Sequence, residues 1–314
     1  MSDRSWLAVL LALSCRAPAS PAGDAGAAAP VGSLHSSAHG DLAVPGRILA
    51  LPEFALSPGQ EVTQCWYVPP DGADHFVHAF RIHASPGSHH LIALRVHDVV
   101  AHPATGPSEC LIPWSDSADY HVDGALPGSV ELETSLVLPD GVAIPLSKNS
   151  GLYFQSHYVN ATPTPIIASI SYAMDGIDPA DVAQQAGVLT YSNTDLDLPP
   201  GRSSATKSCL APADFKLVFA SAHVHEHATH FRSSVNGQSL FEADPSTGTV
   251  GLAFAPPGFD VAMGDAIVWT CDYDNTTGGQ LHYGTSAVRD EMCILGGIFY
   301  PVGPAGQVLS ECFQ

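Results

Sequence analysis

Short apolar stretches separated by turn residues fill the chain from residue 45 onward. The turns include Pro69-Pro70-Asp71-Gly72 and Pro139-Asp140-Gly141. Strands of this length and spacing are typical of antiparallel β-sandwiches rather than of a parallel α/β sheet. The pattern therefore predicts an all-β fold of two antiparallel, jelly-roll-like β-sandwich domains. The stretches are His75–Ile82, His90–Val100, Leu152–Val159, Ile166–Tyr172, Leu217–Val224 and Ile267–Cys271.

The boundary between the two domains is expected near residue 186. A Gly-Val-Leu-Thr-Tyr segment that is typical of a strand begins just after it. The predicted domains are therefore 45–185 and 186–314. One short helix is expected around Pro179–Gln185, and no repeat of fixed period is visible along the chain.

The N-terminal segment resembles an export signal. An apolar run from Trp6 to Leu13 follows Arg4, and it is too short to span a bilayer. The sequence Leu-Ala-Leu-Ser that ends before Cys15 resembles a bacterial lipoprotein signal. We therefore expect a signal at 1–15 with lipidation of Cys15, and a flexible tether at 16–44, rich in Ala, Pro, Gly and Ser. An ordinary secretory leader or an unprocessed N-terminus are the alternatives.

Composition narrows the class of protein. The formal net charge is −20, with 11 Lys and Arg against 31 acidic residues, which excludes a nucleic-acid binder. No later segment is apolar enough for a transmembrane helix. Seven cysteines occur, and without Cys15 an even number remains, which predicts three disulfides in an extracytoplasmic protein, with 15 pairings open. Histidine is unusually frequent, with 16 residues, and indicates metal chemistry.

Three histidines are candidate ligands in the first domain. His89 and His90 are adjacent, and neighbouring side chains of a regular strand point to opposite faces. A distorted strand entry after the preceding Pro-Gly-Ser would let both reach one ion. His157 shares a strand face with Tyr153 and Gln155, and its alternative role is that of a hydrogen-bonded core or surface histidine.

The second domain carries a histidine-rich strand. His223, His225 and His227 would face the same way, but only residues two apart can bind one ion, because they lie about 6.7 Å from each other on a strand. The pair is therefore 223/225 or 225/227, unless the strand presents a solvated polar face. Met292 is either core filler or a thioether ligand, which favours Cu(I).

Together these residues resemble the copper type II, ascorbate-dependent monooxygenases, the family of peptidylglycine α-hydroxylating monooxygenase and dopamine β-monooxygenase. The resemblance covers residues 45–314, and its motifs occur in family order. They are Ser88-His89-His90-Leu91, Gln155-Ser156-His157-Tyr158, His223-Val224-His225, Cys271-Asp272-Tyr273-Asp274-Asn275, and Asp290-Glu291-Met292-Cys293 followed by Tyr300-Pro301.

The resemblance implies two β-sandwich domains with one copper each. An electron-transfer copper would be bound by His89, His90 and His157. An oxygen-activating copper would be bound by the catalytic residues His223, His225 and Met292. Implied disulfides are Cys271–Cys293 and Cys209–Cys312, which leaves Cys65–Cys110 for the first domain.

The implied function is that of an exported, monomeric dicopper monooxygenase of bacterial lipoprotein type. It would hydroxylate a C–H bond of a small molecule with O2 and a one-electron reductant such as ascorbate. The alternatives are a non-catalytic copper-binding or storage lipoprotein on the same scaffold, and a structural adhesion sandwich. The second of these has no need of Met292 beside a His-x-His strand.

The substrate anchor of the peptide-amidating members is absent. Their Arg, Asn and Tyr correspond here to Ser221, Ile294 and Gly296. This difference argues against a peptide C-terminus as substrate. With the net charge of −20, it favours a neutral or amine-bearing small molecule.

Overall fold

Antiparallel strands dominate the computed structural model, which describes residues 46–101, 106–107, 117–245 and 251–302. The expected signal at 1–15, the tether at 16–44 and the lipidation of Cys15 lie outside the described residues. The all-β, antiparallel prediction is confirmed; the pairing of β13 with β9 is a short parallel exception. No helix in the described part of the chain is long and apolar enough to cross a membrane.

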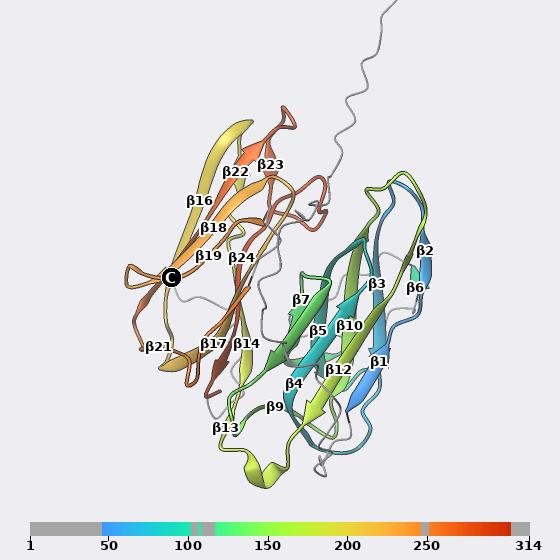
Figure 1. Ribbon diagram of the computed structural model, residues 1–314, viewed down its shortest axis with the longest axis vertical. Coiled ribbons are helices and arrows are strands. Elements are labelled where there is room, and N and C mark those ends of the chain that lie inside the picture. Colours follow the sequence, from blue (N-terminus) through green and yellow to red (C-terminus); the bar gives the residue numbers. More distant parts are fainter. Residues whose placement is uncertain (1–45, 102–105, 108–116, 246–250, 303–314) are drawn as a thin grey trace, which may run out of the picture. The chain divides into compact units, whose positions relative to one another are not determined.

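The first set of strands forms two main sheets (Figure 1). One has the order β1-β12-β4-β9-β13, with β8 paired to β4, and the other has the order β6-β3-β10-β5-β7. A small sheet pairs β2 with β11. The strands are β1 (Arg47–Ala50), β2 (Phe54–Leu56), β3 (Glu61–Val68), β4 (His75–Ala84), β5 (Ser88–His97), β6 (Gly106–Pro107), β7 (His121–Ser129), β8 (Glu133–Val137), β9 (Val142–Leu146), β10 (Gly151–Val159), β11 (Ile166–Ala168), β12 (Ile170–Gly176) and β13 (Gln184–Gln185).

The second set has a matching arrangement. Its main sheets have the orders β14-β24-β17-β20, with β21 paired to β17, and β16-β22-β18-β19, and a small sheet pairs β15 with β23. The strands are β14 (Gly187–Ser192), β15 (Asp197–Leu198), β16 (Gly201–Leu210), β17 (Phe215–Val224), β18 (Ala228–Val235), β19 (Gln238–Ala243), β20 (Gly251–Ala253), β21 (Phe259–Val261), β22 (Ala266–Asn275), β23 (Leu281–His282) and β24 (Cys293–Tyr300).

The two sets repeat one plan. The order β3-β10-β5-β7 corresponds to β16-β22-β18-β19, and both central strand pairs shift register at a bulge near the start of β5 and of β18. The turns before these strands are also alike: the Ser88 amide donates to the Ser85 carbonyl, and the Ala228 amide donates to the His225 carbonyl, each at 3.2 Å.

A buried asparagine at the end of one strand makes equivalent hydrogen bonds in each set. Asn160 and Asn275 each donate from Nδ2 to a backbone carbonyl, of β2 and β15 respectively. Their Oδ1 atoms accept from the amides of Thr162 (2.9 Å) and Thr277 (3.1 Å). The two sets therefore form a structural repeat, which few identical residues mark in the sequence.

Apolar side chains fill each set and continue between them. Phe154 and Tyr172 meet edge to face at 5.1 Å, and Tyr191 stacks on Trp269 at 6.0 Å. Because burial of apolar area is the main favourable term in folding, these aromatic side chains stabilise each set. Among the described residues, no sheet joins a strand before residue 186 to a strand after it, and each set has its own main apolar cluster. The two sets nevertheless lie in one compact unit, and a few side chains of the second set belong to the first cluster, so their independence as domains stays a prediction. Side chains of the second set within the first core are Val218, Ile298 and Tyr300.

The predicted helix around Pro179–Gln185 is wrong for most of its length. A single 3-10 turn spans Pro179–Asp181, and the Asp178 side chain accepts from the Ala180 amide to start it. The chain then extends, and β13 pairs with β9. Backbone hydrogen bonds to a sheet edge replace those of a longer helix.

Candidate metal centre

Five histidines, drawn from both strand sets, gather in one cluster. Neighbouring rings lie with their centroids 5.1 to 5.4 Å apart. Two triads have one ring nitrogen per residue, with all three nitrogens within 4.8 Å of one another. The triads share His89. They are His89, His90 and His157, and His89, His223 and His225.

A bulge lets the adjacent His89 and His90 converge. Opposite β10, His157 pairs with His90 and Tyr158 pairs with Ser88, so His89 is the extra residue of β5. A bulge redirects a side chain that regular alternation would send to the other face. The distorted strand entry expected from the sequence is therefore present, and the two ring centroids lie 5.2 Å apart.

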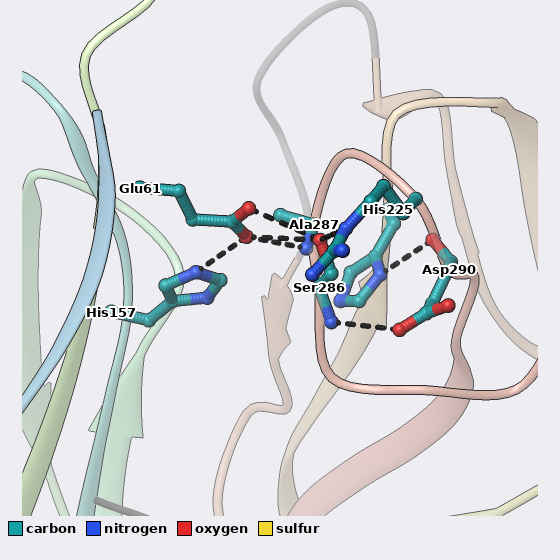
Figure 2. Close-up of polar contacts among 7 residues, drawn as sticks. Glu61, His157, His225, Ser286, Ala287 and Asp290 are labelled. Atoms are coloured by element: carbon teal, nitrogen blue, oxygen red, sulfur yellow. Dashed lines mark hydrogen bonds and ion pairs between the residues drawn. The ribbon is translucent and has the colours of Figure 1, made fainter. Parts of the chain in front are cut away.

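His157 lies on the central strand β10 and is 3% exposed. Its Nε2 lies 2.9 Å from Oε1 of Glu61, at the start of β3 (Figure 2). An ionised carboxylate only accepts hydrogen bonds, so Nε2 carries the hydrogen and Nδ1 keeps its lone pair. This is the arrangement in which a carboxylate orients a metal-binding histidine.

The second strand set contributes His223 and His225. His223 is near the end of β17, and His225 opens the tight turn to β18. His225 donates from Nδ1 to the Asp290 carbonyl at 2.9 Å, which leaves Nε2 as its lone-pair nitrogen (Figure 2). Of the two pairs left open by the sequence, the groups formed by the described residues contain 223/225; His227 is in neither group.

Burial keeps the five imidazoles neutral. It lowers the pKa of His89 to about 3, with neighbouring histidines adding to the shift. Burial also lowers the pKa of the other four, and Glu61 partly opposes this for His157. A neutral imidazole is the form that binds metal, so protons compete weakly for this cluster near neutral pH.

Three ring nitrogens of the cluster are buried without a hydrogen-bond partner among the described residues: Nε2 of His89, Nδ1 of His90 and Nε2 of His225. Buried polar atoms are nearly always paired, because an unpaired one costs about 1–3 kcal/mol. A metal ion is the partner that converging lone pairs of neutral imidazoles suit. The residues present therefore fit a metal, and imidazole ligands suit copper, zinc, iron and nickel.

The loop between β23 and β24, residues 283–292, forms hydrogen bonds with the turn that carries His225. Glu291 is fully buried, and its carboxylate accepts from the amides of His227 (2.8 Å) and His225 (3.3 Å). Burial raises the pKa of Glu291 to about 7. Met292 follows it, is buried, and accepts at its carbonyl from the Tyr273 hydroxyl. The candidate thioether residue is thus fixed two positions from the carbonyl that orients His225.

A disulfide joins Cys271 of β22 to Cys293, directly after Met292. Cys65 and Cys209 are disulfide-bonded as well. Cys110 and Cys312, the partners that the resemblance implies for them, lie outside the described residues, so those two pairings stay predictions.

We expect Cys293→Ser to weaken metal binding by the His223 and His225 part of the cluster more than by the His90 and His157 part. The disulfide closes a loop with a separation of 22 residues, which contributes about 3 kcal/mol in the chain-entropy model. Metal titration of each variant checks this, with Cys209→Ser, at another disulfide-bonded cysteine of the second strand set, as the control. Equal weakening of both parts would instead indicate general loss of structure.

The three positions that differ from the peptide-amidating pattern lie together on paired strands. Ser221 of β17 is opposite Gly296 of β24, and His223 is opposite Ile294. A Cβ at position 296 would lie 2.7 Å from the Ser221 Oγ, so a larger residue there requires Ser221 to move. None of these three positions carries a cationic side chain.

No pattern in the sequence predicts the contacts that Glu61, Glu291 and the Asp290 carbonyl make with the cluster. Glu61 is far from every motif and has no distinctive neighbours in the sequence. Asp290 and Glu291 belong to the motif that contains Met292, but their hydrogen bonds to the histidine turn depend on loop geometry. Only the proximity of Glu291 to Met292 offered a signal.

No family model matches the chain, and no curated protein matches it. One similar solved structure is the major capsid protein P2 from bacteriophage PM2, with 10% identity and a TM-score of 0.31 over 81% of this chain and 97% of that chain. Another is the cowpea mosaic virus top component, a naturally occurring empty particle, with 9% identity and a TM-score of 0.30 over 82% and 94% of the two chains.

Proposed function

We propose that the protein is an exported copper monooxygenase that hydroxylates a C–H bond of a small molecule. The observation that carries the proposal is the convergence of five neutral imidazoles from two strand sets, with three buried ring nitrogens left for a ligand. A structural sandwich has no use for this arrangement, because each unpaired buried nitrogen lowers its stability.

Copper is favoured over other metals because Met292, two positions after the residue that orients His225, would supply a soft thioether ligand. Imidazole alone accepts several metals, but a thioether favours Cu(I). Met292 is buried and tied by its neighbours Asp290 and Glu291 to the turn of His225. Structural zinc, by contrast, typically uses closely spaced cysteine pairs, and Cys271 and Cys293 are oxidised to a disulfide.

Hydroxylation of a substrate R–H needs O2, two electrons and two protons, and yields R–OH and water. Copper in the cluster would supply the one-electron steps of this reaction, and two molecules of a one-electron reductant such as ascorbate would supply the electrons. The chain's own residues hold the neutral tautomers: Glu61 at Nε2 of His157 and the Asp290 carbonyl at Nδ1 of His225.

A neutral or amine-bearing substrate is favoured by the surroundings of the cluster. Ser221, Ile294 and Gly296 offer no cation for a carboxylate, and the net charge of −20 repels anions. An extracytoplasmic location is favoured by the Cys271–Cys293 disulfide, since disulfides persist in oxidising compartments. A leader with a lipid anchor at Cys15 would retain the protein at the cell envelope.

Metal analysis combined with oxygen uptake under ascorbate tests the proposal. We expect bound copper and reductant-dependent oxygen uptake that rises with neutral or cationic substrates. His223→Ala should abolish substrate-dependent uptake, because His223 supplies a ligand nitrogen of the cluster. His83→Ala is the matched control, since the His83 side chain is 61% exposed and lies outside both triads.

Two results would contradict the proposal. Copper binding without turnover would favour the alternative, a copper-binding or storage lipoprotein that uses the same five histidines. Hydroxylation of a glycine-extended peptide, with neutral and cationic compounds inert, would overturn the substrate class.

A further inference from the structure

One carboxylate contacts both strand sets beside the histidine cluster (Figure 2). Oε1 of Glu61 accepts from Nε2 of His157 and from the Ala287 amide, each at 2.9 Å. The Ser286 hydroxyl lies 3.1 Å from Oε2 and 3.3 Å from Oε1. Ser286 and Ala287 are buried, and the Glu61 side chain is 26% exposed. Three donors therefore converge on a largely covered carboxylate.

The loop that contacts Glu61, residues 283–292, also contacts His225 of the second strand set. Within the 283–292 loop, the Asp290 amide donates to the Ser286 carbonyl at 3.0 Å, and the Asp290 side chain accepts from the Ser286 amide at 3.1 Å. Gly284 allows this close folding, because a Cβ there would lie 2.3 Å from the Asp290 carboxylate. The Asp290 carbonyl then accepts from Nδ1 of His225.

A chain of hydrogen-bonded residues thus joins one histidine of each strand set. It runs from His157 to Glu61, through Ser286 to Asp290, and ends at His225. The two ends fix opposite tautomers: Nε2–H in His157 and Nδ1–H in His225. The other ring nitrogen of each histidine therefore carries the lone pair that can bind a metal.

We infer that Glu61 is a positioning residue that couples the two histidine sets, by fixing His157 and by docking the loop that fixes His225. The inference rests on the proposed function only for the identity of the bound metal. A carboxylate that served His157 alone would not need the buried Ser286 and Ala287 donors. One that served only to join the strand sets would not need His157.

Loss of this carboxylate should affect ligands that it does not touch. Removing a partner of a metal-binding histidine typically lowers metal affinity about 10–100-fold. We expect Glu61→Ala to cause a loss of this size at both triads, although His225 has no direct contact with Glu61. Glu61→Gln should restore part of the affinity, since its amide oxygen still accepts but carries no charge.

Three measurements test the coupling. Cu(I) titration gives the affinity at each triad, ¹⁵N chemical shifts of the metal-free protein give the tautomers of His157 and His225, and amide exchange reports the docking of Ala287. Ser286→Ala removes a donor to Glu61 without touching His157. It should speed exchange at Ala287 and leave the His157 tautomer unchanged. Glu53→Gln, at an exposed carboxylate of the same strand set, is the control.

The expected result is a mixed tautomer of His157 and faster exchange at Ala287 in Glu61→Ala, with partial recovery in Glu61→Gln. Unchanged tautomers and exchange, or weakening confined to the His157 triad, would overturn the coupling. A wild-type protein that binds no copper would contradict the proposed function instead, because the tautomer and exchange measurements do not need the metal.

Discussion

Replacing His89 with alanine should weaken metal binding at both histidine triads, whereas His90→Ala should affect only the first triad and His223→Ala only the second. His89 is the residue that the triads share, and because a neutral imidazole has one lone pair, it can bind an ion of only one triad at a time. Loss of a ligand should exceed the roughly 10–100-fold loss of affinity that follows removal of a ligand's hydrogen-bond partner. Copper stoichiometry and Cu(I) affinity of the three variants provide the measurement, with His83→Ala as the exposed control.

The result for His89→Ala distinguishes two assignments. The family resemblance gives His89 only to an electron-transfer copper with His90 and His157. The geometry also places it with His223 and His225, 5.3 and 5.2 Å between ring centroids. A variant that keeps one ion at wild-type affinity would support the assignment from the resemblance.

The metal-free protein should lose stability as the pH falls below about 6.5. The pKa of His89 is lowered to about 3, so the unfolded chain binds a proton between these pH values that the folded chain does not. From an unfolded pKa of about 6.5, His89 alone would lower the free energy of unfolding by about 2 kcal/mol at pH 5. The other four histidines act in the same direction.

The carboxyl group of Glu291 has the opposite effect on stability as the pH falls. Because its pKa is raised to about 7, the folded state takes up a proton there before the unfolded state does, which favours folding as the pH falls towards 4.5. Five histidines lower the free energy of unfolding as the pH falls, and one carboxyl group raises it. The net effect is therefore a loss of stability in acid.

Urea unfolding of the metal-free protein at pH 7.5, 6 and 5 measures the effect. His90→Asn should flatten the dependence on pH, and His83→Asn should not, since His83 is exposed. Copper should raise stability most at neutral pH, where it does not compete with protons for the imidazoles. A free energy of unfolding that stays constant from pH 7.5 to 5 would contradict the burial of neutral histidines.

The all-β fold could be predicted from the sequence because strands depend on local patterns. Short apolar stretches and the turn residues between them placed strands close to β4, β10 and β17, with bounds that differ by a few residues. The candidate histidines also stood out, since His89-His90 and His223-x-His225 are recognisable within three residues. The helix around Pro179–Gln185 failed because pairing with β9, some 40 positions away, determined the end of that segment.

The sequence by itself determined the strands, the turns and the residue types available as ligands. Tertiary structure alone decided that a bulge turns His89 towards both triads and that the two strand sets share one plan. It also brought Glu61 to His157, 96 positions away, and to Ser286, 225 positions away. A bulge depends on the register with a partner strand, and a carboxylate that joins distant donors leaves no periodic pattern. Such contacts arise only when long-range packing has brought the strands together.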